Sequence, residues 1–168
     1  MDRRGRYEFF AQQYRAYLPR VLNYVRLRVD DEDLAQDLTA RTFERALSRL
    51  HTLRDVNAFG GWLFRITRNV VAGHYRQRKR QVPLDWVEEL PAPDDPAESA
   101  LVHAEELQDL RRELTTLEER EQEIIRLRFV AGLTNRAIGK AMGLREGNIA
   151  VILYRALRKL RNRLEQTE

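Results

Sequence analysis

The fold is decided by residues 58–80, which read AFGGWLFRITRNVVAGHYRQRKR. When these residues are placed at steps of 100° around a helix, one narrow face is apolar. That face carries Phe59, Leu63, Ile66 and Val70, with Trp62 beside it. The other side carries Arg65, Arg68, Asn69, Ala72, Arg76 and Lys79. The pattern predicts an amphipathic helix with a core face and a cationic face.

The cationic face is unmixed, because six basic residues and no acidic residue occur between Arg65 and Arg80. Like charges at helical spacing repel by roughly 0.2–0.5 kcal/mol per pair, so a merely solvated face normally mixes signs. A polyanion explains the pattern better, either nucleic acid or an anionic membrane surface. A solubilising face is the alternative. Phe64, Val71 and Tyr75 form a second apolar strip, which we expect to pack against another helix rather than stack on bases.

The composition restricts the chemistry of the chain. Its 168 residues include no cysteine, which excludes disulfides, thiolate zinc sites and cysteine nucleophiles. His51, His74 and His103 lack metal-ligand spacing, and there is no phosphate-binding glycine loop. We therefore expect no metal, no cofactor and no catalytic activity.

No apolar run approaches the roughly 18 residues of a membrane span, and no hydrophobic signal follows Met1. No membrane insertion and a cytoplasmic location are expected.

The charge is segregated along the chain. The net charge of +4 combines +8 over residues 1–80, −8 over residues 81–113 and +4 over residues 114–168. Four of the five prolines, Pro83, Pro91, Pro93 and Pro96, lie in the acidic stretch, which therefore cannot be one continuous helix. These features predict modules at 1–80 and 97–168, joined by an acidic, proline-rich linker at 81–96. A random charge pattern on a single domain is the alternative.

Both modules are expected to be helical, because alternating apolar and polar runs and hairpin dipeptides are scarce. In the first module we predict helices at 7–28, bent near Pro19, at 32–50, capped by Asp30 or Asp31, and at 58–80, capped by Asn57. After the linker, Asp95 and Pro96 open a helix at 97–114, and a capping box at 115–118 opens another that ends before Gly132. Thr134 caps a helix at 135–142, Gly143 ends it, and a last helix covers 146–164.

A short helix, a glycine turn and a long basic helix are typical of a helix-turn-helix. The last helix buries one face, composed of Ile149, Leu153, Ala156, Leu157, Leu160 and Leu164, and directs Val151, Tyr154, Arg155 and Arg158 outward. Outward residues near the start of such a helix reach base edges in the major groove. Arg155 and Arg158 can pair with phosphates or with guanine. Val151 either contacts a thymine methyl group or is a surface residue without a role.

Two regions of the chain resemble a known family. Phe10 to Arg80 resembles the second conserved region of bacterial RNA polymerase sigma factors of the small extracytoplasmic-function type, through LAQDLT (34–39), TFERAL (42–47) and FGGWLFRITRN (59–69). Residues 114–163 are similar to the fourth region, through LEERE (117–121), FVAGLT (129–134) and YRALRKLR (154–161). The resemblance is specific because all these segments occur together, in the order of the family and with the spacing of its two domains.

The resemblance implies a noncatalytic subunit that binds core RNA polymerase and directs it to promoter DNA. The N-terminal module would open the −10 element, with a flipped base held by the 51–58 loop. Its DNA-contacting residues would be Asn57, Arg65, Arg68, Asn69, Arg76, Arg78, Lys79 and Arg80. The helix-turn-helix would read the −35 element through Thr134, Arg145, Asn148, Val151, Arg155 and Arg158. Asp33, Asp37, Arg41 and Glu44 would contact core polymerase, and an anti-sigma protein is the expected regulator.

Three positions depart from the family pattern. Arg41 stands where an acidic or amide residue is usual, and Ala137 stands where glutamate is frequent. Ala150-Val151-Ile152 replaces a Lys-Ser-Arg-like run, which removes polar base-reading groups and predicts an unusual or weak −35 preference.

Other hypotheses explain less of the chain. A stand-alone helix-turn-helix regulator leaves the pattern in 31–80 unexplained, and a membrane-surface protein does not need the second module. A nucleic-acid-processing enzyme lacks the metal and acid–base residues that it would need. Within the sigma-factor hypothesis, the acidic linker could also fold back on the basic faces, since Coulomb attraction favours this at low salt.

Overall fold

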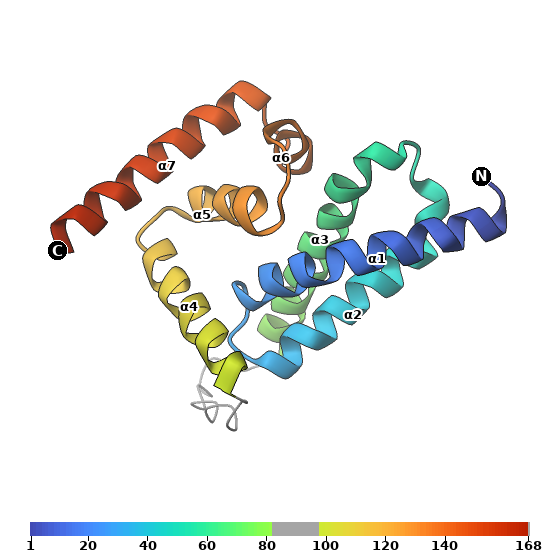
Figure 1. Cartoon of the computed structure of the whole chain (residues 1–168), viewed down its shortest axis with the longest axis horizontal. Coiled ribbons are helices and arrows are strands. Elements are labelled where there is room, and N and C mark those ends of the chain that lie inside the picture. The colour runs from blue at the N-terminus through green and yellow to red at the C-terminus, as the bar shows by residue number, and fades with distance from the viewer. Residues whose placement is uncertain (82–97, 168) are drawn as a thin grey trace.

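In residues 1–81 and 98–167, the part of the chain that the computed structural model describes, the regular elements are all helices (Figure 1). This confirms the all-α prediction. The predicted linker, the Asp95-Pro96 helix start and both module boundaries fall on or beside residues outside these ranges. Within the described residues, no helix is long and apolar enough to cross a membrane.

Three long helices form the first lobe: α1 (Arg3–Arg26), α2 (Glu32–Ser48) and α3 (Phe59–Gln81). The helix α1 begins earlier than predicted, because Asp2 caps it by accepting a hydrogen bond from the Gly5 amide, and it continues through Pro19. Asp31 caps α2 as predicted, accepting a hydrogen bond from the amide of Leu34. The three helices pack against one another in pairs.

The connection from α2 to α3 differs from the prediction. It contains two 3₁₀ turns, Leu50–Thr52 and Val56–Ala58, and the second turn leads directly into α3. The predicted cap Asn57 is wrong, because Asp55 caps the second turn and its side chain accepts a hydrogen bond from the Asn57 amide. The spacing of residues in the sequence did not predict this extra turn. Because of the turn, the capping side chain is at residue 55 and not at residue 57.

The second lobe contains α4 (Glu98–Leu114), α5 (Glu119–Ile125), α6 (Asn135–Met142) and α7 (Glu146–Thr167). A π-helical turn over Arg126–Val130 extends α5, and Gly132 then takes the expected left-handed conformation with φ of 71°. The predicted capping box at 115–118 is displaced: Glu118 is the cap, and its amide donates a hydrogen bond to the Glu121 carboxylate. Thr115 and Thr116 instead donate hydrogen bonds back to α4 carbonyls. The bounds of α6, with Thr134 and Gly143 at its two ends, are as predicted.

The apolar faces meet in one buried cluster that includes residues of both lobes. Phe59, Leu63, Ile66 and Val70 of α3 are buried, as the helical spacing predicted. The second strip also packs as expected: Phe64 and Val71 are buried, and Phe64 makes an edge-to-face contact with Tyr24. The prediction for α7 is correct only in part. It buries Ile149, Leu153 and Ala156 and partly buries Leu160, whereas Leu157 and Leu164 are exposed.

The two lobes are in direct contact, with α6 packed on α3 (Figure 1). The sequence pair Gly60-Gly61 lies at this contact. A Cβ atom at Gly60 would lie 2.6 Å from the Tyr17 hydroxyl and 3.2 Å from Leu133, so the absence of a side chain there leaves room for both. A Cβ atom at Gly61 would lie 3.6 Å from the Ala137 Cβ, which is an ordinary van der Waals distance.

Candidate nucleic-acid interface

The basic face of α3 is exposed along most of its length. The exposed members of the predicted set are Arg65, Asn69, Arg76, Arg78 and Lys79. In the described part of the chain, none of their cationic groups has a carboxylate partner. Unneutralised cations in a row along one helix suit the regularly spaced phosphates of a nucleic-acid strand. The Arg80 side chain lies outside the described side chains.

Arg68 differs from the other cations on this helix. Its guanidinium donates from Nε to Glu123 Oε1 at 2.9 Å and from Nη1 to the Ala141 carbonyl at 2.8 Å, and its side chain is only 30% exposed. Both acceptors belong to the second lobe. Arg68 is therefore occupied by the other lobe in this arrangement.

A cleft of about 600 Å³ lies where the loop before α3 faces α6. It brings together three predicted site residues from the two modules, Asn57, Arg65 and Thr134. It also contains three cations that sequence reasoning missed, Arg54, Arg136 and Lys140, against one carboxylate, Asp55. Arg136 and Lys140 are four residues apart, and this helical spacing was the signal available in the sequence.

The helix-turn-helix is held tightly at its turn. A Cβ atom on Gly139 would lie 2.6 Å from the Leu144 carbonyl oxygen, so only glycine lets α6 approach the turn before α7 this closely. The Thr134 side chain is occupied, since it accepts a hydrogen bond from the Ala137 amide. The remaining predicted −35 residues, Arg145, Asn148, Val151, Arg155 and Arg158, are all exposed on the turn and along α7. They form a surface separate from the cleft.

An ion pair fastens α7 to α5. Lys159 donates to the Glu121 carboxylate at 2.7 Å, and Glu121 is almost fully buried. Burial raises the pKa of Glu121, but hydrogen bonds from Lys159 and from the Glu118 amide outweigh it, so the net shift of this pKa is downward. The hydrogen bond to Glu121 also raises the pKa of Lys159. The pair is one of the contacts between α7 and α5, which also pack against each other.

The predicted polymerase-docking residues share the solvent-facing side of α2. Asp33, Asp37, Arg41 and Glu44 are all exposed. The atypical Arg41 forms an ion pair with Asp37 at 3.0 Å. It therefore neutralises part of an otherwise acidic face.

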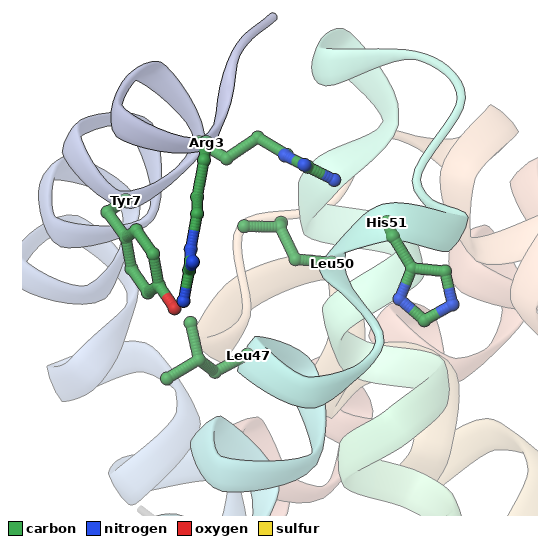
Figure 2. A pocket seen from close by; sticks show the side chains of 6 residues that line it. Arg3, Tyr7, Leu47, Leu50 and His51 are labelled. Atoms are coloured by element: carbon green, nitrogen blue, oxygen red, sulfur yellow. The ribbon is translucent and has the colours of Figure 1, made fainter.

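A smaller pocket of about 200 Å³ lies beside the end of α2 (Figure 2). Leu47 and Leu50 line it together with Arg3, Arg6, Tyr7 and His51, which come from the start of α1 and the first 3₁₀ turn. It places further cations beside the 51–58 loop. No group of three or more His, Cys, Asp or Glu within 1–81 and 98–167 could hold a metal ion.

The charged network around Glu123 also escaped sequence reasoning. Glu123 and Arg126 are buried to about 5% exposure, yet their spacing along α5 resembles that of ordinary surface charges. Tyr24 of α1 and Arg68 of α3 contact Glu123 from the other lobe, and no local sequence pattern indicates these contacts.

The fold, the cationic face and the helix-turn-helix together define a DNA-binding transcription protein. Residues 13–81 match the family model of sigma-70 region 2, and residues 114–162 match that of sigma-70 region 4. The chain therefore belongs to the sigma-70 family, as a sigma factor of the extracytoplasmic-function type. Proteins of this class bind core RNA polymerase and direct transcription initiation at promoters.

Individual relatives agree with this assignment. The chain is 36% identical over 166 residues to the ECF RNA polymerase sigma factor BldN of Streptomyces coelicolor, covering 93% of this chain but only 60% of BldN. It is 27% identical to the ECF RNA polymerase sigma factor SigM of Bacillus subtilis, covering 88% of this chain and 90% of SigM. Its fold is similar to CnrH in the complex with the cytosolic domain of CnrY, with a TM-score of 0.70, 22% identity and coverage of 95% and 89% of the two chains.

Proposed function

We propose that the N-terminal module, residues 1–80, binds and opens the −10 element, while residues 97–168 read the −35 element and residues 81–96 link the two. The observation that carries this proposal is a row of exposed cations on α3 that have no carboxylate partner among the described residues, in a chain that also presents a helix-turn-helix. Phosphates on a melted strand would neutralise Arg65, Arg76, Arg78 and Lys79, and Arg68 once it is free. Arg80 would extend the same row.

Opening DNA requires unstacking bases, at a cost of a few kcal/mol for each extruded base. Stacking on protein groups returns about 1–3 kcal/mol per base, and cation–phosphate contacts add to this. The 51–58 loop supports a role in holding a base, because Asn57 and other residues of the loop line a cleft beside the basic helix. Asn57 and Asn69 offer amides that can bond to a base edge.

The −35 surface is proposed to be Arg145, Asn148, Val151, Arg155 and Arg158, with Thr134 at the start of α6. Val151 is apolar and 46% exposed at a position that faces outward. The Val151 side chain therefore offers only apolar contacts, such as a contact with the methyl group of a thymine. We infer a weaker and less polar −35 preference than a Lys-Ser-Arg-like run would give.

Core polymerase is proposed to dock on the exposed side of α2, against Asp33, Asp37, Arg41 and Glu44. An anti-sigma protein is proposed as a second partner, and the likeness in fold to CnrH, whose solved structure is a complex with the cytosolic domain of CnrY, supports it. We propose that the chain has no catalytic activity of its own and acts in the cytoplasm, where RNA polymerase works.

Reconstitution tests the function. The purified chain is mixed with bacterial core polymerase, and transcription is measured from a promoter library. We expect the chain to co-elute with core and to support initiation at a discrete promoter set. The double variant R76A/R78A should reduce open-complex formation, whereas R15A, an exposed arginine on α1, should not. Binding to DNA without any effect on core polymerase would favour a stand-alone regulator instead.

A further inference from the structure

The small pocket at the end of α2 has apolar walls that the fold leaves open to solvent. Leu50 is buried, whereas Leu47 is 41% exposed and Tyr7 is 53% exposed. Figure 2 shows Tyr7 on α1 facing the side that Leu47 and Leu50 provide. One exposed leucine would need no explanation, but apolar side chains that gather around a hollow are typical of a binding site.

The same pocket is also cationic. Arg3, Arg6 and His51 line it, and its lining residues include no aspartate or glutamate. Within the described residues neither of these arginines has a carboxylate partner. Arg4, on the same turn of α1, differs because it pairs with Glu8 at 3.0 Å. The guanidinium groups of Arg3 and Arg6 are therefore available to an anion from outside the chain.

The size and chemistry of the pocket restrict its ligand. Pockets for drug-sized molecules have volumes of about 300–1,000 Å³, so a pocket of about 200 Å³ suits a smaller group. Leucine and tyrosine side chains suit a flat ring, which can stack on the tyrosine. Guanidinium groups suit the oxygens of a phosphate. A flat ring attached to a phosphate is a nucleotide.

The position of the pocket favours nucleic acid as the source of this nucleotide. Leu50 and His51 line the small pocket, and the residues that follow them, from Thr52 to Asn57, line the cleft of about 600 Å³ beside α3. One loop therefore borders both cavities. A strand that leaves the cleft along this loop brings a neighbouring nucleotide to the small pocket.

We propose that the small pocket binds a nucleotide, with its base against Tyr7, Leu47 and Leu50 and its phosphate on Arg3 and Arg6. A nucleotide within a strand and a free nucleotide present the same chemistry, and the shared loop favours the strand. The first lobe then holds two bases of one melted strand, one on each side of the loop. The assignment to the strand rests on the proposed −10 role of this lobe.

Removal of single bases tests the contact with the ring. The full chain is assembled with core polymerase, and binding is measured to a labelled single strand of a promoter that it recognises, with an abasic site at each position in turn. Wild type should lose affinity at one position for each cavity. Y7A should bind the intact strand about tenfold more weakly, and the abasic site at one of these positions should then have no further effect. Y7F keeps the ring and should behave like wild type.

Salt dependence tests the contact with the phosphate. The double variant R3Q/R6Q should lower the slope of log affinity against log salt by about 0.7, the value for one phosphate of a single strand. An uncharged methylphosphonate at that nucleotide should cause the same loss in wild type and no further loss in R3Q/R6Q. This second measurement needs no altered protein fold. R4Q is the matched control, because Arg4 lies on the same turn but outside the pocket, and its slope should match that of wild type.

Titration of the four deoxynucleoside monophosphates into the full chain, followed by calorimetry, separates the two sources. Binding to wild type but not to Y7A, without any position-specific effect on the strand, would assign the pocket to a free nucleotide. The proposal would be overturned if no abasic position lost its effect in Y7A and no monophosphate bound. If the chain bound no single strand at all, the −10 role would fail, and the monophosphate titration would still decide whether the pocket binds a nucleotide.

Discussion

Arg41 and Asp37 face the solvent one turn apart on α2 and form an ion pair at 3.0 Å, with about half of each side chain exposed. The pair lies in the middle of the side of α2 that also presents Asp33 and Glu44. An exposed pair of this kind contributes little stability, about 0.3–0.5 kcal/mol. Its main effect is to lower the negative potential that a basic partner would meet.

The first prediction concerns that face. R41E frees Asp37 and adds another acidic group, so association with core polymerase should become several times faster at low salt because long-range attraction increases. Stopped-flow fluorescence with labelled core measures the rate at two ionic strengths. R15E makes the same charge change on α1 and should alter the rate much less. Slower association of R41E would mean that the positive charge of Arg41, and not the acidic character of this face, favours docking.

The second prediction concerns the −35 surface. V151R places a cation on the outward side of α7, where it can reach a phosphate, so the slope of log affinity against log salt should steepen by about 0.9. Fluorescence anisotropy of the full chain on a duplex library measures the slope. L164R adds the same charge at an exposed site near the end of the helix and should leave the slope close to that of wild type. If the slope for V151R were the same as for wild type, residue 151 would not face the DNA.

The third prediction concerns the turn of the helix-turn-helix. G139A should destabilise the fold by about 1–3 kcal/mol, since the new methyl group meets a backbone carbonyl that cannot move independently. Urea unfolding followed by circular dichroism measures the loss. G73A is the matched control: its Cβ atom would meet only the end of the Arg76 side chain at 3.9 Å, so helix propensity should give a gain of about 0.5–1 kcal/mol. Equal stability of the two variants would contradict the close approach at the turn.

The fourth prediction concerns acid stability. Hydrogen bonds from Arg26, at 2.5, 2.9 and 3.2 Å, lower the pKa of Glu32. A lowered folded-state pKa contributes stability above the unfolded value of about 4.3 and loses it as the pH falls through the folded value. E32Q should therefore be less stable than wild type at pH 7 by about 0.5 kcal/mol, since the pair is partly exposed. This difference should shrink as the pH falls below the unfolded value.

Urea unfolding at pH 7, 5 and 3 measures the difference. E8Q, which removes a carboxylate from a highly exposed pair with Arg4, serves as the control and should match wild type within error at each pH. If E32Q were less stable than wild type by the same amount at pH 7, 5 and 3, the packing of the side chain, and not its charge, would stabilise this contact.

Periodicity and capping chemistry predicted most of the helices. The bounds of α6 were correct to the residue, because Thr134 and Gly143 satisfy the backbone at its two ends locally. The predictions failed where two neighbouring residues could each act as the cap. Glu118 displaced the threonines as the cap of α5, and the extra 3₁₀ turn moved the acceptor role from Asn57 to Asp55.

The buried residues were predicted correctly for α3 but only in part for α7. The apolar stripe of α3 is buried as expected, whereas Leu157 and Leu164 of the equally periodic α7 are exposed. Periodicity shows that a helix has an apolar face but not how far along that face a neighbour extends.

The sequence by itself determined the helical class, the cationic face of α3 and the family, because each depends on residues close together in the chain or on segments in a fixed order. Only the tertiary structure decided that Arg68 faces Glu123 and that Ala137 rests against Gly61. These residues lie 55 and 76 positions apart, and their contact depends on how two preformed surfaces fit. Local propensity is the same whether the lobes touch or separate, so their arrangement depends on the lobe interface.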